Sequence, residues 1–281
     1  MTSLKYIITA VLLGVFVATA NANKKFAQTD VVQTRETGDA AVVGDDLPVS
    51  RALAAKMIAL AYNDMETINA EPRVAAFSDT DSDKWYDKYV NIVYAQGIMG
   101  GYGGKFAPSD PLTLSQAQVL LSRDEKMQKL RITDENRDKP VSYALWVSLY
   151  KKLVSDLENT EIAQKNIIVL ATHAQNEKLP QYAMVTDIGV FTYQGLVLDG
   201  YLDREISVLC KNDEIVAIES ASNTPPTIKN CTVTAHGNDK IGIEVSGVYR
   251  EFACSPKLDI KVGDLCDITV NDGRVIYYSK S

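Results

Sequence analysis

Side chains that could do chemistry are few in this chain, and they are spread along it. The two histidines, His173 and His236, lie in different sequence settings, and no nucleophile elbow, phosphate loop, zincin helix or dinucleotide fingerprint accompanies them. Acids that stand close in sequence, such as Asp79 and Asp81, could cleave a glycan only across a cleft at a set separation. The sequence therefore predicts that the chain is not an enzyme and that it uses no cofactor.

Metal binding is also disfavoured by the sequence. Asp79, Asp81 and Asp83 could offer alternating oxygens to calcium, but the glycine and the distal glutamate of an EF-hand loop are missing. Asp79 and Asp81 are better suited to accept backbone hydrogen bonds in a turn. No Cys-x-x-Cys pair occurs, and thiolate zinc sites usually have closely spaced ligands. We therefore predict no metal site.

All the cysteines lie in the second half of the chain. An even number of cysteines in an exported chain permits two disulfides with three possible pairings, and buried free thiols are the alternative. The sequence leaves these possibilities open. The candidate disulfide cysteines are Cys210, Cys231, Cys254 and Cys266.

Helices are expected to build the first half. Ser50 is a suitable N-cap, and Leu53, Met57 and Leu60 follow it at helical spacing. A second helix is predicted over residues 84–96, where Gly97 would supply a left-handed C-terminal cap. The last two helices are expected to start at Thr113, which forms a capping box with Gln116, and to cover residues 141–158.

A glycine-rich loop joins the second and third of these helices. Gly100, Gly101, Gly103 and Gly104 allow backbone conformations that other residues avoid. The aromatic residues of the loop are expected to fold back over it as apolar plugs. They are Tyr102 and Phe106.

The N-terminal residues predict export. Lys5 precedes an apolar run from Tyr6 to Ala18, and small residues around Ala22 fit a signal-peptidase site. We predict a signal peptide over residues 1–22 and a flexible linker over residues 23–46, where no periodicity persists. The mature protein is then expected outside the cytoplasm and not in the membrane. The net charge of -7 argues against a nucleic-acid partner.

From about residue 166 the helical period gives way to short β-rich runs. Two of them read as hairpins, one of which turns at Asn271-Asp272-Gly273. Short strands at this spacing predict a small antiparallel barrel or sandwich. The fold class is therefore α+β, with helices before residue 160 and a β-rich domain over residues 161–281.

The segment "FSDTDSDKWYDKYVNIVYAQGIMGGYGGKFAPSDPLTLSQAQVLLSR" resembles an S-layer homology (SLH) repeat. That family has a Phe-x-Asp start, a Trp-led helix, Gly-Ile, a Gly-Tyr-Gly loop, Phe-x-Pro and then a Thr-Arg-Ala-Glu motif that opens the next helix. The segment "LPVSRALAAKMIALAYND" resembles the Thr-Arg-Ala-Glu helix of a preceding unit. An SLH-like helical domain is therefore expected over residues 47–160.

The SLH resemblance implies binding to secondary polymers attached to peptidoglycan. Arg51 would be the motif arginine that contacts the anionic polymer, because a guanidinium group suits bidentate recognition of carboxylates. Ser50 would lie beside it, and Trp85 and the loop Gly101-Tyr102-Gly103 would shape the groove. Leu53 replaces the motif glutamate, and the second motif, which starts at Thr113, has lost its arginine. A fold that keeps the packing but not the binding is the alternative.

The stretch "AMVTDIGVFTYQGLVLDGYLDREISVLCKNDEIVAIES" looks like the N-terminal part of some clostridial stage II sporulation protein D (SpoIID/LytB) proteins. The catalytic domain of those proteins is not expected here, because the sequence ends at Ser281. Two functions follow. The first is a secreted cell-wall or cell-surface protein that docks on secondary polymer or peptidoglycan and whose β domain binds an envelope protein or is displayed. The second is an accessory or remnant subunit of a peptidoglycan-lytic system.

Overall fold

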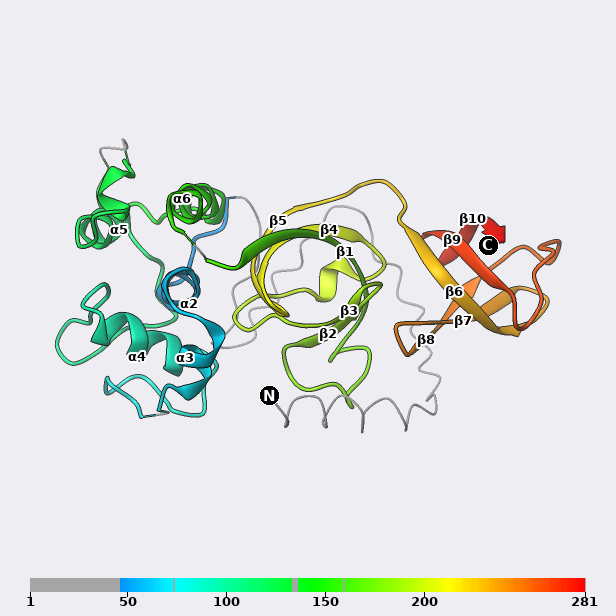
Figure 1. The fold of residues 1–281 in the computed structure, drawn as a ribbon, viewed down its shortest axis with the longest axis horizontal. Helices are drawn as coiled ribbons and strands as arrows, with labels where there is room; N and C mark the ends of the chain where they lie inside the picture. The colour runs from blue at the N-terminus through cyan, green and yellow to red at the C-terminus, as the bar shows by residue number, and fades with distance from the viewer. Residues whose placement is uncertain (1–45, 73, 133–135, 159, 281) are drawn as a thin grey trace.

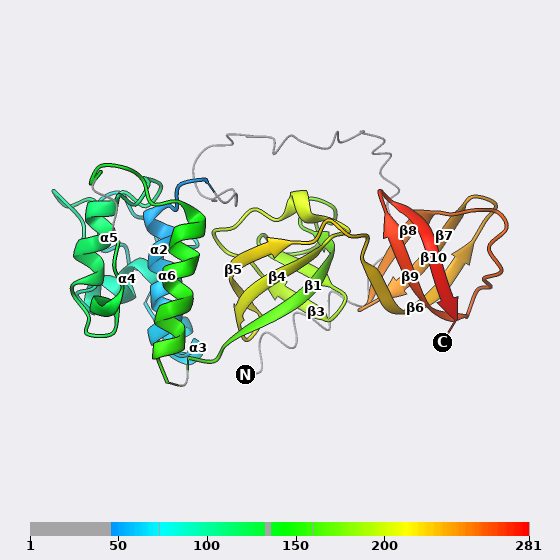
Figure 2. The same ribbon diagram turned by 90° about the horizontal axis from the view of Figure 1, so that it is seen from above.

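The computed structural model describes residues 46–280, except residues 73, 133–135 and 159. The predicted signal peptide and the predicted linker, apart from its last residue, lie outside the described residues. A group of helices, a first β sheet and a second β sheet follow one another in a row (Figures 1 and 2). The α+β class predicted from the sequence is confirmed.

The helical unit comprises residues 47–158, and its helices start where the capping residues predict. Ser50 accepts a hydrogen bond from the amide of Leu53, and Thr113 and Gln116 form the expected capping box. Gly97 has the expected positive φ of 70°. The elements of this unit are α2 (Arg51–Tyr62), α3 (Met65–Ala70), α4 (Asp87–Ala95), α5 (Leu114–Leu121), the 3-10 turn η1 (Met127–Lys129) and α6 (Tyr143–Asp156).

Three short segments form a closed ring from which α2, α5 and α6 start. Each segment reads Pro, an aliphatic residue, then Ser or Thr, and this last residue is the N-cap of its helix. Val49 donates its amide to the carbonyl of Val141 at 2.9 Å, and Val141 donates to Leu112 at 2.8 Å. Leu112 closes the ring by donating to Val49 at 2.9 Å.

The residue after each N-cap repeats this threefold pattern. The amides of Arg51, Leu114 and Tyr143 donate to the carbonyls of Asp110, Lys139 and Leu47, respectively. The helical unit therefore has three equivalent helix starts. Of the three residues that follow the N-caps, Arg51 alone carries a charge, so the start of α2 differs chemically from the starts of α5 and α6.

The first sheet closes on itself in the order β1-β2-β3-β5-β4. Its neighbours pair antiparallel, except for one parallel contact of β3 with β5 at Thr192 and Glu214. The strands are β1 (Ile162–Thr172), β2 (Ala183–Thr186), β3 (Gly189–Thr192), β4 (Glu205–Lys211) and β5 (Glu214–Ala221), and the 3-10 turn η2 (Asp199–Tyr201) precedes β4.

The second sheet repeats this arrangement. Its closed order is β10-β8-β7-β6-β9, which is the circular order of the first sheet applied to the next five strands. The single parallel contact again joins the third and fifth strands, here at Ala253 and Arg274. The strands are β6 (Thr227–His236), β7 (Lys240–Val245), β8 (Val248–Ala253), β9 (Leu265–Asn271) and β10 (Arg274–Lys280).

Two closed sheets therefore stand where the sequence analysis expected one small barrel or sandwich. The strands of both are short and similar, and the link between them is the brief polar run from Ser222 to Pro226. Such a run looks like one more turn, so the hydrophobic pattern does not mark where one sheet ends.

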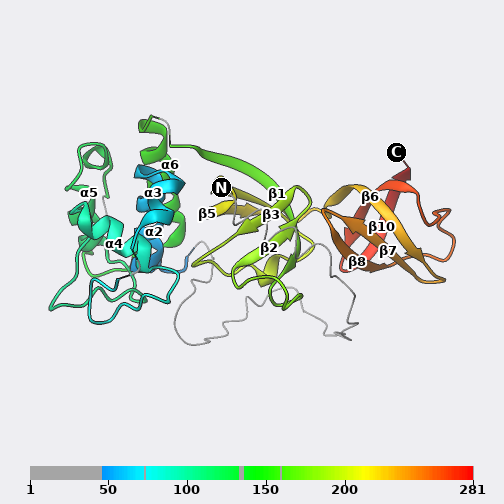
Figure 3. The ribbon, with the colours of Figure 1, turned by 60° about the horizontal axis from the view of Figure 1, so that its bottom comes forward.

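The helical unit packs directly on the first sheet through α2 and β5 (Figure 3). Lys56 is fully buried there, where it forms an ion pair with Glu214 and donates to the carbonyls of Gln194 at 2.6 Å and Ile215 at 2.7 Å. A buried charge is tolerated only when it is paired and hydrogen-bonded, as this ammonium group is. One hydrophobic core runs through both parts.

Candidate functional site

Arg51 is held by the loops around it. Its Nε donates to the carbonyl of Phe106 at 2.8 Å, its Nη2 donates to the carbonyl of Gly100 at 2.8 Å, and its Nη1 donates to Gln116 at 3.3 Å. The guanidinium group also lies 4.8 Å from the centre of the Phe106 ring. With 9% of its surface exposed, Arg51 fastens the glycine loop to the start of α2.

Asp79 fastens the same loop from the other side. Its carboxylate accepts the amides of Phe106 and Ala107, each at 2.7 Å. Asp79 therefore binds backbone far along the chain, whereas Asp81 accepts locally from the amide of Asp83, as a turn acid does. Ala107 takes a positive φ of 56°, and Asp79 helps to hold this strained residue in place.

Burial lowers the pKa of Arg51, and the carboxylates of Asp110 and Asp79 oppose this shift. An arginine stays charged through such shifts because its ordinary pKa is above 12. The loop is therefore organised around a permanent positive charge whose donors face carbonyl groups.

The glycine loop is a tight hairpin. Tyr102 and Lys105 pair through two backbone hydrogen bonds of 2.8 and 3.1 Å, and the glycines between them, Gly103 and Gly104, have φ values of 58° and 77°. Positive φ at both central residues is typical of a type I′ turn, which glycine adopts without strain. At Gly101 a Cβ atom would lie 2.1 Å from the carbonyl oxygen of Lys105, so glycine is required there too.

Tyr102 stands out from this hairpin, with 94% of its surface exposed. The prediction that Tyr102 folds back as an apolar plug is therefore wrong, while Phe106 is buried as predicted. The Phe106 ring packs with Phe77, with the ring centroids 5.5 Å apart. The Lys105 side chain is exposed beside Tyr102.

Trp85 lies elsewhere, at the junction with the first sheet. It is 8% exposed, and a Cβ atom at Gly195 would lie 2.4 Å from its ring. Its neighbour Tyr89 donates its hydroxyl to Gln194 at 3.1 Å. The structure thus brings together Ser50, Arg51 and the hairpin, and places Trp85 against the sheet. Whether these residues bind polymer stays a prediction.

Gln116 also belongs to this cluster, through a contact with Arg51 that the sequence did not indicate. The capping box predicts that its Oε1 accepts the amide of Thr113, which it does at 3.2 Å. The same oxygen accepts from Arg51, which starts a different helix. The ring of helix starts explains this contact, because it sets the starts of α2 and α5 side by side.

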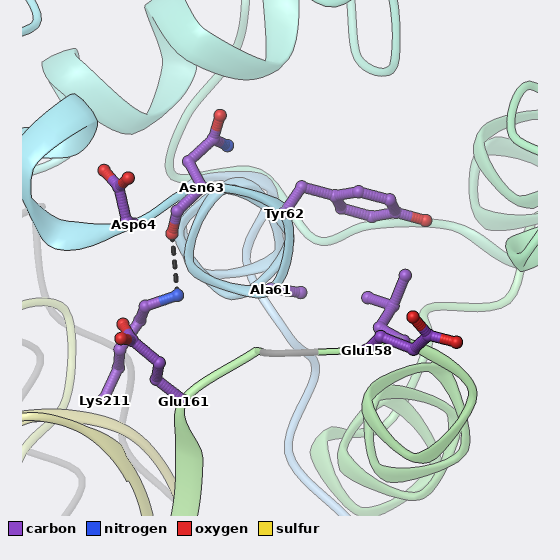
Figure 4. A pocket seen from close by; sticks show the side chains of 8 residues that line it. Ala61, Tyr62, Asn63, Asp64, Glu158, Glu161 and Lys211 are labelled. Atoms are coloured by element: carbon purple, nitrogen blue, oxygen red, sulfur yellow. Dashed lines mark hydrogen bonds between the residues drawn. The ribbon is translucent and has the colours of Figure 1, made fainter.

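A cavity of about 310 Å³ opens at the far end of α2, between the helical unit and β4 (Figure 4). Lys211 reaches across from β4 and donates to the carbonyls of Leu60 at 3.0 Å, Asn63 at 2.7 Å and Thr160 at 2.8 Å. Asp64 caps α3 by accepting from Thr67. Lys211 therefore joins β4 to the end of α2, and Asp64 supports the start of α3 beside it. The cavity is lined by Ala61, Tyr62, Asn63, Asp64, Leu157, Glu158, Glu161 and Lys211.

The described part of the chain holds neither a cluster of metal ligands nor a helix that could span a membrane. Among those residues, no three side chains of His, Cys, Asp or Glu gather as metal ligands would. None of the helices that the structure describes combines the length and the apolar character that a membrane span requires.

Comparison with known proteins places one segment in a family. Residues 76–117 match the model of the S-layer homology domain, and this stretch contains α4, the Tyr102 hairpin and the start of α5. No curated protein and no solved structure matches the chain. The resemblance to an SLH repeat is thereby confirmed for this segment, and SLH domains are non-catalytic modules associated with the cell surface. The resemblance to stage II sporulation protein D, with the lytic role that it implies, stays a prediction.

Proposed function

We propose that the helical unit docks the chain non-covalently on a secondary cell-wall polymer or on peptidoglycan. The observation that carries this proposal is the SLH match over residues 76–117, whose hairpin presents an aromatic ring to solvent. The protein is then secreted and held at the cell surface. The two sheets extend from the docked unit and are available to an envelope partner.

The hairpin supplies the contact with the polymer in this proposal. Tyr102 offers an exposed ring face on which a sugar can stack, and Lys105 places an exposed cation beside it for an acidic substituent. Because the turn between them is tight, the backbone that carries both side chains is already ordered before a ligand binds, and this lowers the entropic cost of binding.

Arg51 acts in this proposal as a positioning residue. Its donors hold the carbonyls of Phe106 and Gly100, which flank the hairpin on both sides. The motif arginine therefore shapes the loop, and the polymer is contacted by the side chains that the loop presents. Its positive charge adds to the attraction for an anionic polymer.

Co-sedimentation with purified cell-wall sacculi tests the proposal. The protein should pellet with intact sacculi and stay in solution with sacculi from which the secondary polymer was extracted; equal retention on both would leave peptidoglycan itself as the ligand. Lys105→Ala should weaken pelleting, and the matched control Lys261→Ala, at an exposed lysine of the loop between β8 and β9, should not. Failure of the wild-type chain to pellet with either preparation would refute the proposal.

Arg51→Ala and Arg51→Lys separate positioning from contact. Both variants should lose part of the binding and also part of the thermal stability, because the carbonyls of Phe106 and Gly100 lose a bidentate donor. Loss of binding at unchanged stability would instead make Arg51 a direct ligand of the polymer.

A further inference from the structure

Two of the four cysteines stand directly opposite each other in the second sheet. Cys231 on β6 is the register partner of Cys266 on β9, and these strands run antiparallel. Both side chains are 0% exposed and belong to the core of that sheet. Directly opposite residues of an antiparallel pair point to the same face, so the two thiols share one side of the sheet.

The backbone there suits a cross-link. Opposite Cα atoms in antiparallel strands lie about 4.5–5.5 Å apart, and this range falls within the span that a disulfide bridges. The pairing of β6 with β9 shifts in register between Ile228 and Cys231, and Cys231 and Thr232 are again directly opposite Cys266 and Leu265. Burial raises the pKa of Cys231, and the nearby Cys266 thiol adds to this shift.

The other two cysteines lie in different surroundings. Cys210 belongs to β4 of the first sheet, apart from the other cysteines. All four are free thiols in the structure, where Cys210 donates to the carbonyl of Ala163 at 3.4 Å and Cys231 to the carbonyl of Ile228 at 3.3 Å. Cys254 follows β8, and the charged groups that act on its thiol are Asp239 and Arg274. Of the pairings open to the sequence, the register supports the one between Cys231 and Cys266.

We propose that Cys231 and Cys266 form a cross-strand disulfide in the exported protein, while Cys210 and Cys254 remain thiols. The bond forms by thiol–disulfide exchange with a small disulfide or a disulfide oxidoreductase. One cysteine thiolate attacks the oxidant disulfide and releases a thiol, and the second cysteine then displaces the other half of the oxidant. Both cysteines lose a proton, and the oxidant takes up two electrons and leaves as two thiols.

Burial sets when this reaction takes place. It raises the pKa of Cys231 to about 12 and also raises the pKa of Cys266, so neither thiol ionises readily in the folded sheet. The thiolate is the reactive form, so exchange belongs to the stage at which β6 and β9 are still pairing. Once formed, the bond is shielded from reductants until the sheet opens.

Mapping of disulfides by mass spectrometry tests this proposal. The full chain is unfolded and reduced, refolded with a mixture of oxidised and reduced glutathione, alkylated in denaturant and digested without reduction. A peptide that joins Cys231 to Cys266 is expected, with Cys210 and Cys254 alkylated. Alkylation of all four cysteines, or a cross-link that involves Cys210 or Cys254, would overturn the proposal.

Melting temperatures give an independent readout. Wild-type chain that was reduced while unfolded and then refolded in reductant should have a Tm of the second sheet about 10 °C or more below that of the oxidised chain, because a closed loop of this length constrains the unfolded state strongly. The double variant C210S/C254S should show the same fall. The double variant C231A/C266A should show none, and a fall of equal size in that variant would contradict the assignment.

Discussion

The two closed sheets share one strand order but differ in how far their last strand is buried. In the first sheet β5 buries a continuous run, Glu214 to Ile218, without alternation. In the second sheet β10 buries Val275 alone, and a bulge next to it turns Ile276 and Tyr277 outward. An unbroken buried run is expected only where both faces of a strand are covered.

The helical unit makes this difference. The Tyr143 hydroxyl accepts from the amide of Ile218 at 2.7 Å and donates to its carbonyl at 3.0 Å, and Lys56 donates to the carbonyl of Ile215. Side chains from α6 and α2 thereby pair backbone groups of β5. Within the described residues, no element covers β10 in the same way. The comparison teaches that the neighbour of a sheet, more than its topology, decides which of its strands are buried.

Breaking the buried ion pair should have the largest effect. Lys56→Ala leaves Glu214 buried without its cation, and we expect the free energy of unfolding of the helical unit and first sheet to fall by about 3–5 kcal/mol. Hydrogen exchange recorded at increasing denaturant concentration measures this fall. The amides of β9 in the second sheet should keep their protection from exchange. The apolar double variant K56M/E214L should recover most of the loss.

The matched control is Lys240→Ala in the second sheet. Lys240 pairs with Glu251 at 2.7 Å on the surface, and solvent screens this pair. We expect no measurable change in stability. If Lys56→Ala and Lys240→Ala had equal effects, the buried pair would not be what joins the helical unit to the first sheet.

Removal of one hydroxyl should have a smaller effect. Tyr143→Phe keeps the ring but leaves both backbone groups of Ile218 without this partner, which should cost about 1–3 kcal/mol. Exchange of the Ile218 amide should accelerate much more than exchange of the corresponding residues of β10. Unchanged exchange at Ile218 would show that water replaces the hydroxyl freely.

Alkaline pH should separate the two parts of the molecule. Burial raises the pKa of Tyr193 to about 12 and also raises the pKa values of Tyr89 and Tyr150, and all three belong to the core shared by the helical unit and the first sheet. The unfolded chain releases these protons near pH 10 while the folded chain keeps them. The stability of this part should therefore fall as the pH rises from about 10 to about 12. The pH series uses the oxidised protein, because free thiols at Cys231 and Cys266, whose pKa values burial also raises, would make the second sheet lose stability at alkaline pH too.

Phenolate absorbance and hydrogen exchange, recorded along the same pH series, check this prediction. Phenolate from the buried tyrosines should appear together with unfolding of the helical unit and first sheet, and β9 should keep its protection at a pH where β5 has lost it. Earlier loss of protection in β9 than in β5 would show that the buried tyrosines of the helical unit and first sheet do not set the alkaline stability.

Local features of the fold were predictable from the sequence. The N-caps at Ser50 and Thr113 and the positive φ of Gly97 depend on neighbouring residues, and each is found as predicted. The hairpin turn at Asp272 and Gly273 has positive φ at both residues, as such a turn requires.

Long-range contacts were not predictable in the same way. Lysine is a residue expected at the surface, yet Lys56 and Lys211 are buried. Both carbonyls that Lys56 binds, and two of those that Lys211 binds, lie more than 130 residues away in the sequence. At the candidate site the type of Arg51 was informative, but its partners are carbonyls of Phe106 and Gly100, which carry no signal in the sequence.

The smallest change tests the central claim, which is that the helical unit binds the wall polymer through its hairpin. Binding isotherms with sacculi compare two exposed tyrosines, Tyr102 in the helical unit and Tyr277 in the second sheet, which is 64% exposed. Tyr102→Ala should weaken binding by about 1 kcal/mol, or about fivefold in Kd, at unchanged Tm, and Tyr277→Ala should leave both unchanged. If Tyr277→Ala weakened binding and Tyr102→Ala did not, the second sheet would be the docking part and the account would be wrong.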